Sequence, residues 1–153
     1  MICEGLKFNK TLKLLQLEGE ANIEHVKVYC EVLKTNKPIT DLIIYLNTEV
    51  VKIIAELLKI NKTISELTIA IAAIHVEGAE AITNTLIWNR TLTALDLTTS
   101  IITKKEIIFI SEALKVNATL AILDLSENGI DGEGAEAIAE ALKINKTLTN
   151  LDT

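Results

Sequence analysis

Hydrophobic residues recur along this chain in one fixed pattern. An aliphatic residue is followed by two residues, a second aliphatic residue, one residue and a third aliphatic residue. The copies are Leu12/Leu15/Leu17, Ile39/Leu42/Ile44, Ile64/Leu67/Ile69, Leu92/Leu95/Leu97 and Leu120/Leu123/Leu125, and a sixth copy begins at Leu148/Leu151. Alternation at the last two positions is typical of a β-strand with one buried face. The pattern therefore predicts a short strand in each copy.

After each strand the hydrophobic spacing changes to that of a helix, in which residues three and four apart share a face. This spacing is found at Ala79/Ile82/Leu86, Ile107/Ile110/Leu114 and Ala135/Ile138/Ala139/Leu142. Thr103 and Glu106 have the spacing of a capping box, and Asp131 holds the same place as Thr103 one copy later. Each strand is therefore expected to be followed by a loop and a helix.

A polar phrase, Asn-Lys-Thr-Leu or a close variant, separates each helix from the next strand. Its asparagines are Asn9, Asn36, Asn61, Asn89, Asn117 and Asn145, which are 27, 25, 28, 28 and 28 residues apart. Asn tolerates the left-handed conformation that ends many helices, so we expect it to end each helix in this way. A period of this size indicates stacked repeats rather than one globular core.

Parallel strands joined by helical returns form a continuous sheet with helices on one face. Because a helix is wider than the spacing between strands, the stack should bend with the sheet inside. The sequence thus predicts an α/β solenoid, a right-handed horseshoe arc with a parallel sheet on the concave face and helices on the convex face. We expect residues 1–153 to form a single domain of about five repeats, with partial repeats at both ends. The second repeat is short, so we expect a shortened connection near Thr48–Val51.

The clearest copy runs from Leu120 to Asn145, with Leu-Asp-Leu-Ser-Glu-Asn at 123–128 and Gly-Ala-Glu-Ala-Ile-Ala-Glu-Ala-Leu at 134–142. These residues resemble the leucine-rich repeat superfamily, specifically its ribonuclease-inhibitor-like class, whose repeat length matches the last spacings of 28 residues. Ribonuclease inhibitor, Ran GTPase-activating protein and NOD-like receptor sensor regions have such repeats. The resemblance implies a protein-binding module. It leaves two alternatives open: a GTPase-activating or NOD-like-receptor-type regulatory fragment, and a structural remnant of a larger repeat protein.

The resemblance also implies a turn residue, usually Asn, Cys or Thr, eight positions after the first Leu of each copy. The residues found there are Glu20, Asn47, Ala72, Ser100 and Asn128. In the family this side chain bonds to backbone groups of the turn. We expect the bond to be absent at Ala72 and poor at Glu20.

Composition supports an aliphatic solenoid, with 49% hydrophobic but only 3% aromatic residues. Charged residues interrupt every apolar run before the roughly 18 residues that a membrane span needs, and the first ten residues lack the apolar region of a signal peptide. We therefore expect a cytoplasmic protein without membrane association. Cys3 and Cys30 have neither metal-binding nor disulfide spacing, so each is expected to fill an apolar slot.

The net charge of −6 lies entirely in the second half of the chain. Residues 1–76 hold nine basic and nine acidic side chains, whereas residues 77–153 hold six and twelve. An acidic surface repels phosphate backbones, so nucleic acid is not expected as a partner. A basic protein is the favoured partner.

The strand residues between the buried ones should lie in columns on the concave face. We predict that a protein partner rich in Lys and Arg binds there, at Asp96, Asp124, Asp152, Thr98, Ser126, Glu66 and Tyr45. The three aspartates should stack about one strand spacing apart, which favours a basic ligand. The competing interpretation is that Leu-Asp-Leu is simply the ordinary sequence of this repeat.

The remaining polar motifs favour structural roles, and we expect no catalytic, cofactor or metal site. His25 and His75 have no second ligand or nucleophile at useful spacing. The Asn-x-Thr phrases fit the glycosylation sequence, but their place in the repeat already explains them. Arg90, beside the end of a helix, is expected to be a solvated charge.

Two further expectations concern apolar surfaces. Trp88 holds a recurring apolar position that we expect to be packed in the core, together with Phe8, Ile60, Val116 and Ile144. The ends of the stack show no polar capping repeat, which leaves two interpretations open: the chain is a slice of a longer solenoid, or its ends pair with another chain, as in self-association.

Overall fold

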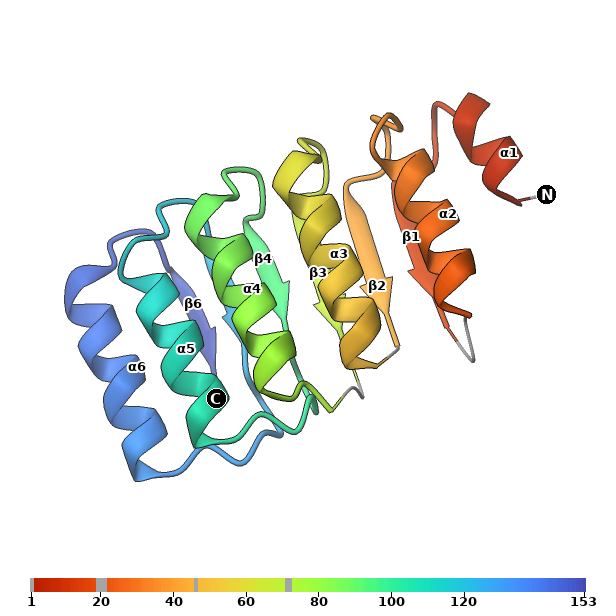
Figure 1. The fold of residues 1–153 in the computed structure, drawn as a ribbon. Helices are drawn as coiled ribbons and strands as arrows, with labels where there is room; N and C mark the ends of the chain where they lie inside the picture. The colour runs from red at the N-terminus through yellow and green to blue at the C-terminus, as the bar shows by residue number, and fades with distance from the viewer. Residues whose placement is uncertain (1, 19–21, 46, 71–72) are drawn as a thin grey trace.

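Short strands and longer helices alternate through residues 2–18, 22–45, 47–70 and 73–153, which the computed structural model describes (Figure 1). The strands are β1 (Leu14–Leu17), β2 (Asp41–Ile44), β3 (Glu66–Ile69), β4 (Ala94–Asp96), β5 (Ile122–Asp124) and β6 (Asn150–Asp152). The helices are α1 (Ile2–Phe8), α2 (Ile23–Leu33), α3 (Thr48–Ile60), α4 (Val76–Trp88), α5 (Lys104–Leu114) and α6 (Gly132–Ile144). Of these helices, none is long and apolar enough to cross a membrane.

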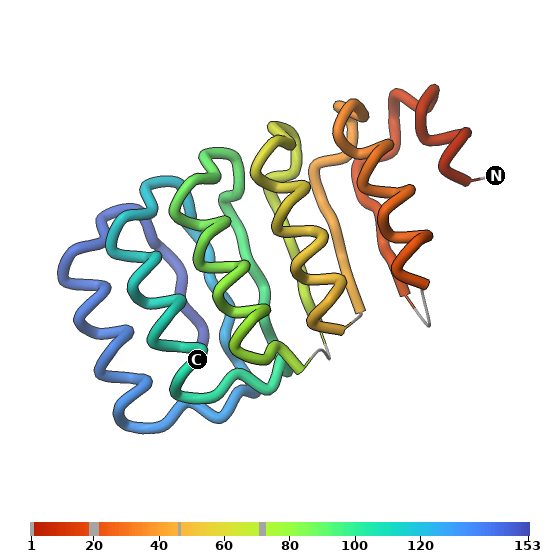
Figure 2. The backbone as a smooth tube through the Cα atoms, viewed as in Figure 1, coloured from red at the N-terminus to blue at the C-terminus, as the bar shows by residue number. Residues whose placement is uncertain are grey.

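The strands form one parallel sheet in chain order, with the row of helices along one of its faces (Figures 1 and 2). Equivalent residues pair from strand to strand, so that Leu42 lies between Leu15 and Leu67. Likewise, Leu123 lies between Leu95 and Leu151. The predicted α/β solenoid is therefore confirmed, because every return through a helix advances the sheet by one strand.

One continuous aliphatic core fills the space between the sheet and the helices. The three leucine-type positions are buried in the four copies from Ile39 to Leu125. The predicted helix positions Ile82, Leu86, Ile107, Ile110 and Leu114 are buried against them. In the first copy Leu12 is exposed, whereas Leu15 and Leu17 are buried. Each repeat thus buries its aliphatic face against its neighbours, as expected for a solenoid.

The asparagine of the repeated phrase ends its helix, but not by the mechanism we predicted. The backbone φ angles of Asn61 and Asn89 are −67° and −69°, which is extended rather than left-handed. The Asn89 Oδ1 atom accepts hydrogen bonds from the backbone N–H groups of Thr91 at 2.8 Å and Leu92 at 2.7 Å. Its Nδ2 donates to the Leu58 carbonyl of the preceding repeat at 2.7 Å. The left-handed prediction was wrong because the side chain itself satisfies the backbone groups of the turn.

The same three bonds recur at Asn61, Asn117 and Asn145, which forms a ladder of asparagine side chains between repeats. Asn61, Asn89 and Asn117 are buried. Their amide nitrogens already donate to a carbonyl, so these sites do not accept a glycan in the folded protein. The phrase is a structural element that connects one repeat to the next.

The turn after each strand makes a second connection between repeats where the residue type allows it. The Ser100 hydroxyl donates to the Ile69 carbonyl at 2.8 Å, and the Asn128 amide donates to the Leu97 carbonyl at 2.9 Å. These bonds confirm the role implied by the family resemblance. Asn47 instead caps the next helix, while Glu20 and Ala72 lie outside the described residues.

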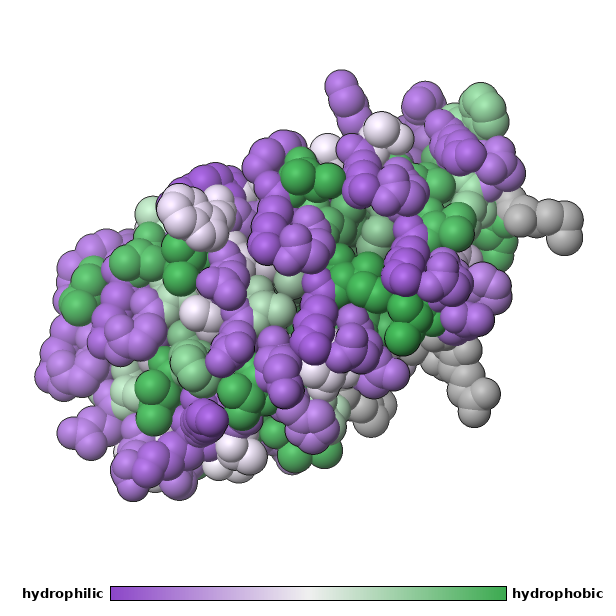
Figure 3. Space-filling view, viewed as in Figure 1, coloured by the Kyte–Doolittle hydropathy of each residue, from purple (hydrophilic) through white to green (hydrophobic). Residues whose placement is uncertain are grey.

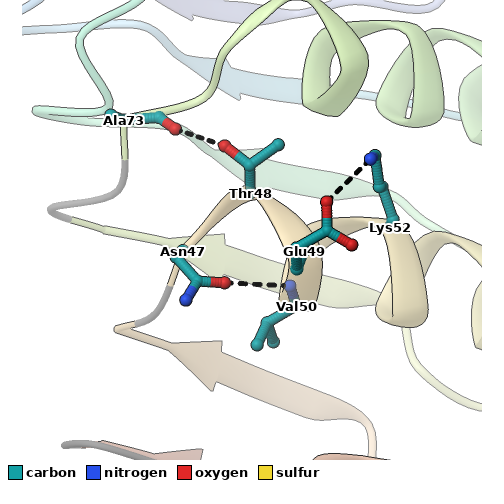
Figure 4. Close-up of polar contacts among 6 residues, drawn as sticks. All are labelled: Asn47, Thr48, Glu49, Val50, Lys52 and Ala73. Carbon is teal, nitrogen blue, oxygen red and sulfur yellow. Dashed lines mark hydrogen bonds and ion pairs between the residues drawn. The ribbon is translucent and has the colours of Figure 1, made fainter. Parts of the chain in front are cut away.

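The connection into α3 is shortened, as predicted. Strand β2 ends at Ile44 and α3 begins at Thr48, whereas β4 and α5 are separated by the longer segment from residue 97 to residue 103. Asn47 Oδ1 accepts from the Val50 N–H at 3.3 Å, and the Thr48 hydroxyl donates to the Ala73 carbonyl at 2.6 Å (Figure 4). Thr48–Val51, which we assigned to the connection, is the first turn of the helix, because Asn47 caps the chain directly after the strand.

Two predicted helix starts are confirmed. The Glu106 carboxylate accepts a hydrogen bond from the Thr103 backbone N–H at 3.1 Å, and it also contacts the Thr103 hydroxyl. One repeat later, Asp131 accepts from the Gly134 N–H at 2.9 Å. Both bonds satisfy groups that the first turn of a helix leaves without a partner.

The cysteines lie where the sequence suggested. Cys30 is buried in the core, and this burial raises its thiol pKa to about 11. The thiol therefore stays protonated and unreactive near neutral pH. Cys3 is half-buried and packs against the same core.

One recurring apolar position is exposed, contrary to our prediction. Phe8 is 77% exposed and Trp88 is 72% exposed. Ile60, Val116 and Ile144 are also more than half exposed. Successive helix residues are about 100° apart, so a residue two positions after the buried Leu86 points away from the core. The prediction that these residues are packed in the core was wrong. An apolar residue recurs at this position of the repeat, but the position lies on the solvent side of the helix end.

The last helix of the stack, α6, differs from the helices inside it. On α6, Ala135, Ala139 and Leu142 are exposed. Ile107 and Leu114, at the places of Ala135 and Leu142 one repeat earlier, are fully buried under α6. The outer face of α6 therefore presents apolar positions that an adjoining repeat covers elsewhere in the stack.

Candidate functional site

The face of the sheet opposite the helices, called the open sheet face below, carries the predicted column of aspartates. Asp96 pairs in register with Asp124, and Asp124 pairs with Asp152. Neighbouring strands in a sheet are about 4.8 Å apart, so each aspartate has a like charge close by on the adjacent strand. The structure therefore places all three carboxylates side by side on β4, β5 and β6.

Two of these carboxylates accept hydrogen bonds from the residue two positions later in the chain. Asp96 Oδ1 accepts from the Thr98 N–H at 2.9 Å and from the Thr98 hydroxyl at 2.6 Å. Asp124 Oδ1 accepts from the Ser126 N–H at 2.8 Å. These bonds form the turn that ends each strand, so the aspartates have a structural role in addition to any binding role.

The Asp124 carboxyl has a pKa below its ordinary value. The Ser126 hydroxyl is the main cause, the Ser126 backbone N–H and the Thr98 hydroxyl add to it, and partial burial acts in the opposite direction. Asp124 is therefore ionised at neutral pH. A carboxyl with a depressed folded-state pKa stabilises the fold above the unfolded-state pKa, and this contribution is lost as the pH falls through the folded-state value.

The other two predicted residues lie apart from this group. Glu66 on β3 pairs in register with Ala94, in a different column from Asp96. Tyr45 follows β2, where its N–H donates to the Leu17 carbonyl at 3.0 Å. The structure thus brings together five of the seven predicted residues, which we call the acidic strip: Asp96, Thr98, Asp124, Ser126 and Asp152.

An apolar residue beside the acidic strip was not part of the predicted site. Ile122 on β5 is 45% exposed and lies between Ala94 and Asn150 on the open sheet face. An aliphatic residue at an outward strand position, where other copies have Asp41 and Glu66, was the sequence signal for it. The acidic strip therefore has an apolar neighbour that a partner could cover.

We next consider whether the described residues could bind a metal ion or use a histidine in catalysis. Within the described residues, no group of three or more His, Cys, Asp and Glu side chains could hold a metal ion. His75 is the N-cap of α4, the slot that the sequence assigned to it, and His25 is exposed on α2. The aspartate column is better suited to meeting cationic side chains than to chelating a metal.

Comparisons with known proteins agree with this fold. A family model described as leucine-rich repeat matches residues 116–139. The C-terminal domain of tropomodulin from Caenorhabditis elegans superposes with a TM-score of 0.73 at 13% identity, covering 94% of this chain and 91% of that one. Actin-binding site 2 of leiomodin-1 has a TM-score of 0.53 at 24% identity, covering 98% of this chain and 75% of that one. No curated protein sequence matches the chain. The ribonuclease-inhibitor-like class stays a prediction.

Proposed function

We propose that this chain, a leucine-rich repeat protein, binds another protein on its open sheet face through the acidic strip. The observation that carries the proposal is the register of Asp96, Asp124 and Asp152 on adjacent strands. Three like charges so close together repel one another, and cationic side chains from a partner would relieve this repulsion. The acidic strip is thus a surface whose electrostatic energy improves on binding.

The partner that fits this strip carries Lys or Arg side chains at a spacing near that of the strands. Guanidinium groups bind carboxylates with two parallel hydrogen bonds, which favours arginine. Exposed Ile122 adds apolar area next to the charges, where a partner's aliphatic or aromatic side chain would pack. A basic segment with an apolar residue is therefore the proposed ligand.

Actin is the first individual partner to test. The leiomodin-1 domain is named as an actin-binding site, and it shares this fold. A shared fold at 24% identity does not transfer a partner by itself, so actin enters as a candidate. The cytoplasmic location expected from the sequence is part of the same proposal.

The regulatory alternative, a GTPase-activating fragment, has weaker support. Arg90 is the only arginine in the chain. Its guanidinium donates to the Ile87 carbonyl at 2.8 Å and to the Asn89 carbonyl at 3.0 Å, at the end of α4 and not on the open sheet face. We expect that this chain does not stimulate GTP hydrolysis by small GTPases in a turnover assay. The structural-remnant alternative predicts no saturable ligand at all.

We expect the double change Asp96→Asn and Asp124→Asn to weaken binding of a Lys- and Arg-rich peptide by about tenfold, since each exposed ion pair contributes up to about 1 kcal/mol. Asn keeps the oxygen that accepts from the turn N–H groups, so the fold should be retained. Fluorescence anisotropy of the labelled peptide, and co-sedimentation with actin filaments, measure the effect. Binding should also weaken as salt is raised.

The matched control is Glu80→Gln with Glu136→Gln, which removes the same charge from exposed positions on helices α4 and α6. This control should bind like the unaltered protein. Equal weakening by both double variants would show that only net charge matters and would remove the acidic strip as the site.

Self-association through the ends of the stack is a second, separate proposal, favoured by the exposed apolar face of α6. Within the stack, the Asn145 amide donates to the Leu114 carbonyl at 2.7 Å. Asn9 and Leu142 occupy the equivalent places at the two ends, so head-to-tail copies could make the same bond. Sedimentation velocity should show association that rises with concentration and is lost in Leu142→Glu. A monomer at every concentration would contradict it.

A further inference from the structure

The rim of the stack where the helices end, called the helix-end rim, carries two neighbouring columns of side chains. The first column is the exposed apolar residue before five of the six asparagines, Thr35 being the exception: Phe8, Ile60, Trp88, Val116 and Ile144. The second column is cationic and directly follows five of the six asparagines, Ala118 being the exception: Lys10, Lys37, Lys62, Arg90 and Lys146. Hydrophobic and hydrophilic groups alternate along this edge, at the top of Figure 3.

The cationic column is not neutralised by neighbouring carboxylates. Lysines one position before the apolar column pair with a glutamate one helical turn earlier, as Lys59 does with Glu56. Among the salt bridges of the described residues, none uses a member of the cationic column. All five of its members are exposed. Therefore the helix-end rim is positively charged even though the chain as a whole has a net charge of −6.

The opposite rim, where the helices begin, carries acidic side chains. The first turns of the six described helices carry an acidic residue: Glu4, Glu24, Glu49, Glu77, Glu106 and Glu133. Lys104 and Lys105 are the basic residues of these first turns. Glu24, Glu49 and Glu133 pair with Lys27, Lys52 and Lys104. The unpaired positive charge of the two rims therefore lies on the helix-end rim, which would orient the molecule at a charged surface.

The apolar side chains of the helix-end rim are exposed, and one of them, Ile60, also lines a hollow. Trp88 and Phe8 are the most exposed of them, and aromatic residues of this kind favour the boundary between lipid and water. Between the ends of α2 and α3 lies a hollow of about 310 Å³ lined by Ile60, by Lys34, which pairs with Glu31, by Lys37 and Lys62, and by threonine and asparagine residues. Such a hollow suits a phosphate headgroup better than an apolar helix of a protein partner.

We propose that the helix-end rim binds the surface of a membrane that contains anionic lipids. The apolar column enters the headgroup region while the cationic column contacts the lipid phosphates. The acidic rim then faces away from the membrane, and the open sheet face stays free at the side. The sequence-based expectation of no membrane association considered only membrane-spanning segments, and it placed the apolar column in the core. This binding uses a different surface from the acidic strip and is independent of the proposed function.

Trp88 provides the test, because it is the only tryptophan in the chain. Its fluorescence should shift to shorter wavelength when vesicles of phosphatidylcholine with phosphatidylserine are added, and brominated lipid in those vesicles should quench it. Vesicles of phosphatidylcholine alone should give neither change. The shift should disappear at high salt, because screening removes the attraction between exposed charges.

The variant Lys37→Gln with Lys62→Gln should reduce co-sedimentation with the anionic vesicles by about 25-fold, since each cation near an anionic leaflet contributes about a factor of five. The control Lys104→Gln with Lys105→Gln removes the same charge from the opposite rim and should bind within about twofold of the unaltered protein. Ile60→Ser should also weaken binding, which a purely electrostatic contact would not show.

Absence of any Trp88 shift with anionic vesicles at low salt would overturn the proposal. Equal losses in the two lysine double variants would do the same. If a glutamate-rich amphipathic peptide shifts the Trp88 fluorescence and vesicles do not, the helix-end rim is a protein-binding surface instead.

Discussion

Replacing Asn89 with alanine is expected to lower the free energy of unfolding by about 3–5 kcal/mol. The change removes three hydrogen bonds at a side chain that is only 2% exposed. Each buried polar group left without a partner costs about 1–3 kcal/mol, and water reaches the turn only in part. For a chain of this length the melting temperature should fall by roughly 10 °C. Urea unfolding followed by circular dichroism measures the effect.

Asn9→Ala is the matched control for this prediction. Asn9 makes the same two bonds within its own turn, to the N–H groups of Thr11 at 3.0 Å and Leu12 at 2.7 Å. Among the described residues, its amide nitrogen does not donate to a carbonyl as that of Asn89 does. We expect a loss below about 1 kcal/mol, because water replaces these bonds at an exposed turn. A similar loss in both variants would show that the bond between repeats contributes little.

Leu95→Ala is expected to destabilise the protein by about 2–5 kcal/mol, as do other leucine truncations in packed cores. Leu95 is 1% exposed and lies on the central part of the sheet, between Leu67 and Leu123. The cavity cannot easily close, because strands on both sides fix the backbone around it. Thermal unfolding monitored by calorimetry checks this value.

The same truncation at the end of the stack should have a much smaller effect. Leu151 on β6 holds the equivalent position but is only half-buried, with one neighbouring strand. We expect Leu151→Ala to cost about 1 kcal/mol, since less apolar area is lost from a partly hydrated site. Comparable losses at Leu95 and Leu151 would contradict the nearest-neighbour picture of solenoid stability.

The repeat made the fold predictable from sequence, since every copy gives independent evidence for the same unit. The strands, their register and the helix starts at Thr103 and Asp131 follow from spacing alone. The conformation of Asn89 did not follow, because Asn can end a helix either through its own backbone or through its side chain. Only the carbonyl of Leu58 in the preceding repeat decides between these two, and that contact is tertiary.

The acidic column was predictable for the same reason, since equal register puts equal positions side by side. The hydrogen bonds that Thr98 donates to Asp96 were not predictable, because they depend on how the chain turns after the strand. Trp88 was assigned to the wrong side of its helix. Repetition of an apolar residue type signals burial in most helices, but here the repeated residue lies two positions beyond the buried Leu86 and therefore faces solvent.

The most direct test of the proposed function is an NMR titration of the isotope-labelled protein with a Lys- and Arg-rich peptide. We predict saturable shifts that are largest at the amides of the acidic strip and of Ile122, and small shifts along the helices. Asp96→Asn with Asp124→Asn should abolish most of them. Shifts confined to the helices or to the helix-end rim, or no saturable shifts at low salt, would contradict the assignment of the open sheet face as the binding site.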